Sequence, residues 1–174
     1  MTKEIEYLRT VDKETFLGYC RCNVFQTDSH FSLSDVFSTS LLSDKYDQFI
    51  IEMYQERGIS IAELIYDFGP FDLAKTNIND FKKFSYAELL RELNEYWTDE
   101  TWGEDLSLFK KNFDKVISFL KNYELKNREF YYLNLEQARK EILPFPEGIW
   151  IYFVGIFSLD IENQNLIVMC FGND

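Results

Sequence analysis

The chain has 174 residues, 46% of them hydrophobic, which is enough for one domain with a full core. Its formal net charge is -12 at a pI near 4.6. This balance argues against direct binding to nucleic acid or to an anionic membrane, because lysine and arginine drive both interactions. An acidic surface favours solubility, and it favours fast association with a basic partner. Either of these two effects would explain the net charge.

The ends of the chain and its cysteines predict a cytoplasmic protein. No apolar segment near the N-terminus resembles a signal peptide. The longest apolar run, residues 148–159, is too short for a transmembrane helix. Cys20, Cys22 and Cys170 are an odd number without the spacing of a disulfide framework, which predicts reduced thiols.

The first third of the chain predicts strands and then helix. Residues 4–25 are rich in aromatic and β-branched side chains and predict two short strands or a hairpin. A polar turn containing His30 follows. Apolar residues spaced by three and four then predict helix to about residue 56, with a break near Ser43 and Gly58 just past its end.

Two capping-box patterns mark the middle of the chain. Residues 60–63 (Ser-Ile-Ala-Glu) predict a short helix that residues 69–70 (Gly-Pro) end. Residues 85–88 (Ser-Tyr-Ala-Glu) begin a second helix, and residues 71–84 between them are expected to be irregular. The apolar stripe of the second helix is formed by Leu89, Leu90, Leu93, Tyr96 and Trp97.

The last third predicts a long amphipathic helix and then a sheet. The helix covers about residues 104–122, followed by a strand at 129–133 and a short helix at 134–142. Residues 149–160 and 166–171 form a hairpin that is apolar on both faces, as is typical of central strands.

The order of strands, helices and strands predicts an α+β fold. We expect a single domain over residues 1–174, because no linker or repeat divides the chain. Its antiparallel sheet includes the C-terminal hairpin, at about 149–171, and a helical block, at about 34–123, packs on it.

Motifs for catalysis or cofactor binding are absent from the sequence. No phosphate-binding glycine loop occurs, and a zinc site at Cys20 and Cys22 would need a carboxylate or His30 as a further ligand. We expect no cofactor, no metal and no enzyme activity. One catalytic alternative stays open: carboxylates near Trp97 and Trp102 could hydrolyse a glycoside.

Residues 95–105 (Glu-Tyr-Trp-Thr-Asp-Glu-Thr-Trp-Gly-Glu-Asp) hold five carboxylates and three aromatic side chains without a base. Aromatic residues anchor interfaces, and carboxylates steer basic partners. Trp97 is expected in the core, because it continues a helix stripe, whereas Trp102 fits core or surface. The predicted partner-binding residues are Asp99, Glu100, Trp102, Glu104 and Asp105, joined by Asp35, Asp44 and Asp47.

The charge changes sign across this segment. Residues 88–105 are rich in acids and residues 106–128 in bases. Two antiparallel helices with these charges could simply neutralise each other.

Residues 37–47 (Phe-Ser-Thr-Ser-Leu-Leu-Ser-Asp-Lys-Tyr-Asp) and 148–159, within a small acidic α+β chain, resemble immunity proteins of bacterial contact-dependent growth inhibition and other polymorphic toxin systems. The resemblance implies one-to-one binding of a toxin C-terminal domain, often a basic nuclease, whose active site or substrate groove is blocked. An acidic adaptor or nucleic-acid mimic remains an alternative, and the sequence leaves the oligomeric state open.

Overall fold

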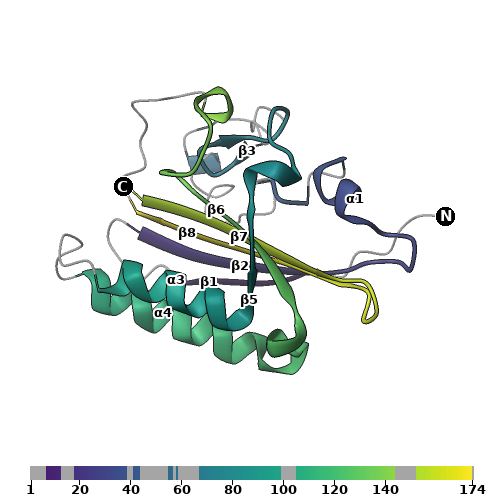
Figure 1. Ribbon diagram of the computed structural model, residues 1–174. Coiled ribbons are helices and arrows are strands. Elements are labelled where there is room, and N and C mark those ends of the chain that lie inside the picture. Colours follow the sequence, from purple (N-terminus) through teal and green to yellow (C-terminus); the bar gives the residue numbers. More distant parts are fainter. Residues whose placement is uncertain are drawn as a thin grey trace.

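The computed structural model describes residues 7–12, 18–38, 41–43, 55–56, 58, 67–98, 105–143 and 152–173. Within these ranges the fold is α+β, as predicted. Two helices cover one face of a six-stranded antiparallel sheet, and a short helix, a small hairpin and turns cover the other (Figure 1).

The sheet has the strand order β1-β2-β8-β7-β6-β5, and every neighbouring pair is antiparallel. The predicted N-terminal strands form a hairpin that pairs with the last strand of the chain. The six strands are β1 (Tyr7–Asp12), β2 (Gly18–Gln26), β5 (Lys82–Ser85), β6 (Glu129–Asn134), β7 (Tyr152–Asp160) and β8 (Asn165–Asn173).

The C-terminal hairpin is the centre of the sheet. Strands β7 and β8 pair from Tyr152 with Asn173 to Asp160 with Asn165, and residues 153–158 and 165–172 are buried on both faces. The prediction of a central hairpin is confirmed. Covering both faces explains why its sequence lacks alternation of apolar and polar residues.

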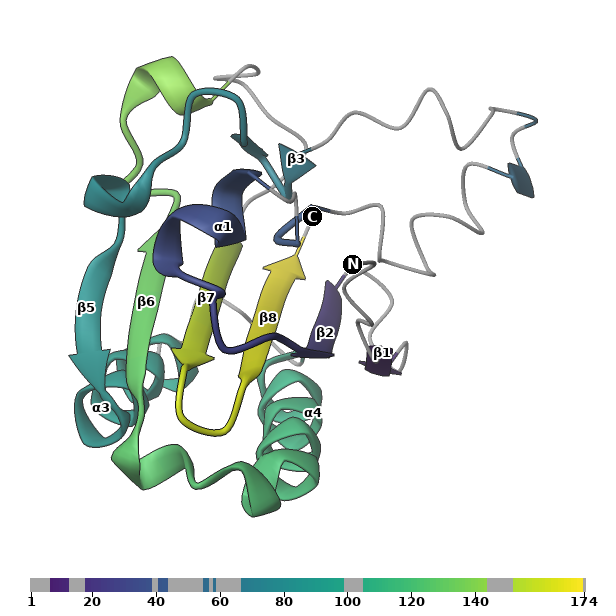
Figure 2. The same cartoon turned by 90° about the vertical axis from the view of Figure 1, so that its right-hand side faces the viewer.

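The two long helices lie on one face of the sheet (Figure 2), and a core of aliphatic and aromatic side chains is buried between them and the strands. Helices α3 (Tyr86–Trp97) and α4 (Asp105–Phe119) pack there, and the described apolar residues of their predicted stripes contact this core. The buried side chains of these two helices include Leu89, Leu93, Phe113 and Val116.

The start of α3 is the predicted capping box. Ser85 Oγ accepts a hydrogen bond from Glu88 N at 3.3 Å, and Glu88 Oε2 accepts from Ser85 N at 2.8 Å. Two donors that the first helical turn leaves open are thereby satisfied. Helix α4 continues into two 3₁₀ turns, η5 (Leu120–Tyr123) and η6 (Leu125–Asn127), which meet at Glu124 in a left-handed conformation (φ 50°).

The opposite face is covered by short elements around a cluster of phenylalanines. Helix α1 (Leu33–Ser38) and the hairpin of β3 (Asp67–Phe68) and β4 (Phe71–Asp72) lie there, with the 3₁₀ turns η3 (Ile78–Asp80) and η7 (Lys140–Ile142). Edge-to-face ring pairs tie the hairpin to the sheet; the rings of this cluster include Phe68, Phe71, Phe81, Phe153 and Phe157.

Several sequence predictions on this face were wrong. Residues 71–84 are not irregular: they contain β4, η3 and β5, so strands interrupt the predicted helical block. Residues 69–70 form the turn between β3 and β4 rather than a helix end. Strands this short lack a readable hydrophobic period, and their ring contacts come from distant strands.

Other helix predictions met mixed outcomes. Residues 134–142 form a turn and η7 instead of an α-helix. Helix α1 ends at Ser38. Most of the helix predicted from there to about residue 56 lies outside the described residues. Residues 60–63, the first predicted capping box, also lie outside them. The prediction for Gly58 is confirmed, because its φ is 70° and it lies two residues after helical Gln55 and Glu56.

Among the described helices, none has the length and apolar character needed to span a membrane.

Candidate functional site

The structure places two of the eight predicted partner-binding residues, Asp35 and Asp105. Asp105 is the first residue of α4, and Asp35 lies in the first turn of α1. The other six lie outside the described residues: Asp44, Asp47, Asp99, Glu100, Trp102 and Glu104. The side chain of Trp97, the last residue of α3, is also outside them, so its predicted burial stays a prediction.

Asp35 has a structural role. Its Oδ2 accepts hydrogen bonds from the backbone N–H and the hydroxyl of Ser32, each at 2.8 Å, which caps the start of α1. Helix α1 and helix α4 pack on opposite faces of the sheet (Figure 1). Asp35 and Asp105 therefore do not share one flat surface.

The acidic side of α3 leads toward the predicted site. Glu88 is engaged with Ser85, whose hydrogen bonds lower the pKa of Glu88. Glu92 and Glu95 follow it one and two turns along α3, and neither forms an ion pair with another described residue. Helix α3 thus presents carboxylates up to the point where the acidic segment of residues 98–105 begins.

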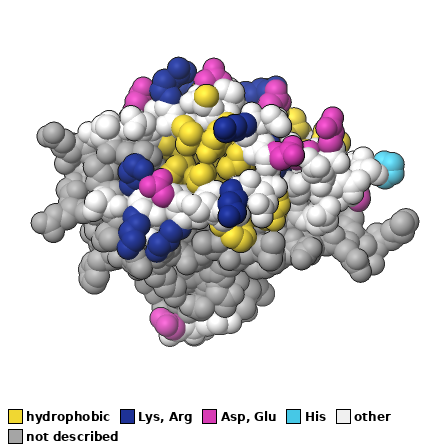
Figure 3. Space-filling view, turned by 90° about the horizontal axis from the view of Figure 1, so that it is seen from below, with side chains coloured by type: hydrophobic (Ala, Val, Ile, Leu, Met, Phe, Trp, Pro, Cys, Tyr) yellow, Lys and Arg dark blue, Asp and Glu magenta, His cyan; other side chains and the backbone are white. Residues whose placement is uncertain are grey.

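The lysines of α4 lie on the helix beside these carboxylates. Lys110 pairs with Asp114 of its own helix at 2.9 Å, and no ion pair within the described ranges joins a carboxylate of α3 to a lysine of α4. The possibility that the two helices neutralise each other's charge stays a prediction. Between the helices lies a hydrophobic patch bordered by charged side chains (Figure 3).

The cysteines are buried and reduced. Cys20 and Cys22 lie on the helix-covered face and Cys170 on the other. Burial raises the pKa of Cys22 far above its usual range, with a smaller contribution from Cys170, so its thiolate is strongly disfavoured. His30 is exposed in a turn. No group of three metal-ligating side chains occurs in the described part of the chain.

Arg128 forms a buried polar centre that the sequence did not indicate. Its Nη1 and Nη2 each donate to Asn165 Oδ1 at 2.7 Å, and its Nε donates to Ser158 Oγ at 3.1 Å. Burial lowers the pKa of Arg128, while Asp160 opposes that shift. The side chain joins the start of β6 to the end of the β7–β8 hairpin.

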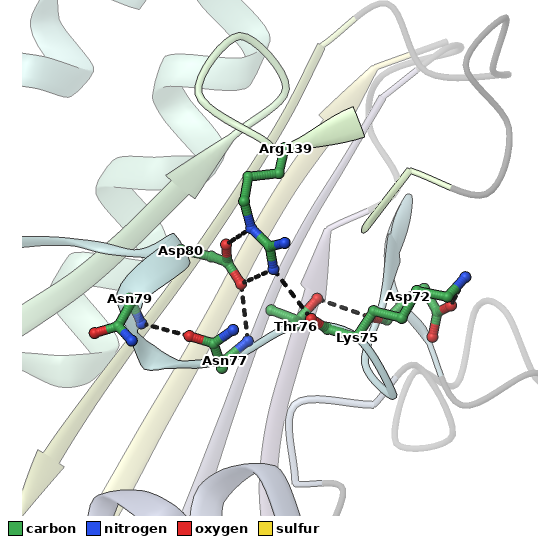
Figure 4. A network of polar contacts seen from close by, with 7 residues as sticks. All are labelled: Asp72, Lys75, Thr76, Asn77, Asn79, Asp80 and Arg139. Carbon is green, nitrogen blue, oxygen red and sulfur yellow. Dashed lines mark hydrogen bonds and ion pairs between the residues drawn. The ribbon is translucent and has the colours of Figure 1, made fainter. Parts of the chain in front are cut away.

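A second polar cluster joins the turn before β5 to the segment after β6 (Figure 4). Arg139 donates from Nη2 to Asp80 Oδ2 at 3.0 Å and to the backbone oxygen of Lys75 at 3.2 Å. The hydrogen bond from Arg139 is the main cause that holds the pKa of Asp80 below its usual range, and the Asp80 side chain is only 3% exposed. Asp80 also completes a capping box with Asn77.

Sequence reasoning missed these polar clusters for a physical reason. Arg128 and its acceptors are 30 and 37 residues apart, and Asp80 and Arg139 are 59 apart. No local period connects such partners. The Asn77–Asp80 cap carried a local signal, since asparagine and aspartate cap helices as serine does.

Comparison with known proteins assigns no family. No family model matches the chain, and no curated protein matches it. Among solved structures, citrus MAF1 in crystal form P 31 2 1 has 15% identity and a TM-score of 0.39 over 91% of this chain and 88% of that chain. The C 2 2 21 form has 12% identity and a TM-score of 0.36 over 91% of each chain. Scores this low support no conclusion about fold or function.

Proposed function

We propose that this chain is an immunity protein that binds and neutralises a basic toxin domain, most simply a nuclease. The observation that carries the proposal is the line of carboxylates on α3. Glu92 and Glu95 have no cationic partner among the described residues, and the chain continues from them into the segment with Asp99, Glu100 and Trp102.

The charge arrangement fits such a partner. A nuclease that binds phosphates is basic. The carboxylates on α3 of this chain would accelerate the approach of such a nuclease and could occupy its phosphate groove. Trp102 would supply the aromatic anchor that interfaces use. Steric exclusion of substrate then inhibits the toxin without any chemistry by this chain.

The test is binding to the toxin domain encoded beside this gene. Co-expression should rescue growth, and the association rate should fall about tenfold or more as ionic strength rises from about 0.05 M to about 0.5 M. A rate indifferent to salt would overturn the electrostatic part of the proposal.

A matched pair of variants locates the interface. Replacing Asp99, Glu100, Glu104 and Asp105 by lysine should weaken binding by about 100-fold or more, because repulsion replaces attraction. The control replaces exposed Glu136 and Glu141 by lysine and should change affinity little. Equal losses in both variants would contradict an interface at residues 99–105.

Specificity separates the alternatives. An immunity protein protects against one toxin only, whereas a nucleic-acid mimic would compete with duplex DNA for several unrelated binders. Rescue from several nucleases would favour the mimic.

A further inference from the structure

A groove with an apolar floor lies where the start of α3, the end of α4 and η6 meet. Its volume is about 460 Å³, and its apolar lining comes from Tyr86, Ile117 and Leu125. Leu125 is buried in the core under the helices, and Tyr86 and Ile117 pack against that core. Figure 3 looks onto this side of the molecule and shows hydrophobic side chains between charged ones. The volume is within the range of sites that hold small molecules.

The charged lining of this groove is mainly basic. Lys121 of η5 and Lys126 of η6 both line it, and neither forms an ion pair within the described part of the chain. The one acid of the lining, Glu124, lies between them in the sequence. Its Oε2 accepts a hydrogen bond from Asn127 Nδ2 at 3.5 Å and pairs with neither lysine. Both ammonium groups are therefore available to an anion.

Tyr86 adds a neutral donor to the lining. Burial raises the pKa of Tyr86, so its hydroxyl keeps its proton well above neutral pH. This hydroxyl forms no hydrogen bond with another residue that the structure describes. The ring is held against that of Phe130, with the two centroids 5.9 Å apart. The groove thus joins a fixed apolar floor to one hydroxyl donor and two cations, as ligand sites do.

The link between the two lysines is strained. Glu124 has φ 50° and ψ 45°, the left-handed conformation that disfavours a residue with a side chain and that glycine adopts without cost. Strained residues of this kind concentrate at binding sites. Here the strained residue separates η5 from η6, the two turns whose lysines line one groove.

We propose that this groove binds a small amphipathic carboxylate. The apolar body of the ligand lies on Tyr86, Ile117 and Leu125. Its carboxylate accepts hydrogen bonds from the ammonium groups of Lys121 and Lys126 and from the Tyr86 hydroxyl. Hydrogen bonds between ionised partners are the strong ones, and the apolar floor leaves water when the ligand covers it.

The charge of the lining selects the head group of the ligand. Two lysines against one glutamate leave a net charge of +1, which matches the single charge of a carboxylate. The proposal goes beyond the proposed function, since no groove residue belongs to the predicted toxin interface. The ligand also carries the charge opposite to that of a basic toxin.

Titration of the full chain with sodium octanoate, followed by the amide signals in nuclear magnetic resonance spectra, tests the site. Octanoate should bind with a Kd of about 1 mM or lower and shift the signals of Tyr86 and residues 117–127. Octanamide has the same apolar body without the charge and should bind about tenfold more weakly. Unchanged groove signals at about 10 mM octanoate would overturn the proposal, as would equal affinity for octanamide. Shifts of equal size on the opposite face of the sheet would mean unspecific adsorption and would also overturn it.

Variants of the lining test each role. Lys121→Gln with Lys126→Gln should weaken octanoate binding about tenfold, and Tyr86→Phe, which keeps the ring, about threefold. Glu124→Gln removes the one repelling charge and should strengthen binding about threefold, a gain that damage to the fold would not produce. The control Lys140→Gln removes an exposed lysine of η7, on the opposite face, and should change nothing. Equal losses in the paired lysine variant and the control would contradict the site.

The two proposals fail separately. The groove variants should still rescue growth against the toxin, because the groove lies outside the predicted toxin interface. Loss of octanoate binding with growth rescue intact would locate the ligand site, whereas failure of rescue by the native chain would leave the groove measurements unaffected.

Discussion

The two faces of the sheet are covered in different ways. On one face, α3 and α4 present regular stripes of mainly aliphatic side chains to the strands. On the other face, short strands and turns are held by phenylalanine contacts and by the Asp80–Arg139 pair (Figure 4).

The difference concerns how strongly the contacts depend on each other. Truncating one side chain of a helix stripe costs unfolding free energy mainly through the cavity that it leaves at its own place in the core. The aromatic face is tighter. A methyl group at Gly155 would come within 2.3 Å of the Phe68 ring, and one at Gly69 within 2.1 Å of the Phe153 ring. We therefore expect mutations on this face to show coupling and mutations under the helices to show additivity.

The largest expected effect is that of Phe68→Ala. Phe68 is fully buried and contacts the rings of Phe71 and Phe153, so its removal should cost about 4 kcal/mol of unfolding free energy. Hydrogen exchange should show faster exchange mainly in β3 and β4, with α3 and α4 still protected. An equal loss of protection in α3 and α4 would contradict the expected difference between the two faces.

Gly155→Ala should destabilise the fold by about 2 kcal/mol in urea unfolding, because the added methyl group overlaps the Phe68 ring. Phe68→Leu in the same chain removes that overlap. The double variant should therefore cost less than the sum of the two single changes. Simple additivity would show that the aromatic face is no tighter than the helix face.

Ser85→Ala probes the helix face through its cap. The change removes the hydroxyl contacts to Glu88 and should lower the unfolding free energy by about 1 kcal/mol. The matched control is Ser118→Ala, an exposed serine on α4, which should change stability by less than about 0.5 kcal/mol. A similar cost at both positions would exclude the cap as the cause.

The smallest expected effect is a pH dependence at Asp80. The pKa of Asp80 is depressed chiefly by the hydrogen bond from Arg139. The pair therefore stabilises the fold fully at pH values above the unfolded-state pKa, which is near 3.9. This stabilisation is lost as the pH falls through the lower folded-state pKa. Asp80→Asn should lower Tm by up to about 4 °C at neutral pH and leave it unchanged in strong acid. A Tm difference that persists in acid would point to packing instead.

Much of the fold could be predicted from the sequence alone. The central hairpin, the N-terminal hairpin, α4 and the capped start of α3 follow from local patterns, because side-chain period and capping depend on residues only a few positions apart. Of the candidate site, the sequence alone marks the acidic segment at residues 95–105 and the change of charge that follows it.

Only the tertiary structure decided the rest. It brought Phe68 against Gly155 and Arg128 against Asn165, separated Asp35 from Asp105 by the thickness of the sheet, and set an acidic and a basic helix side by side around an apolar groove. These relations join residues far apart in the chain. They arise from packing and strand order, which leave no period in the sequence.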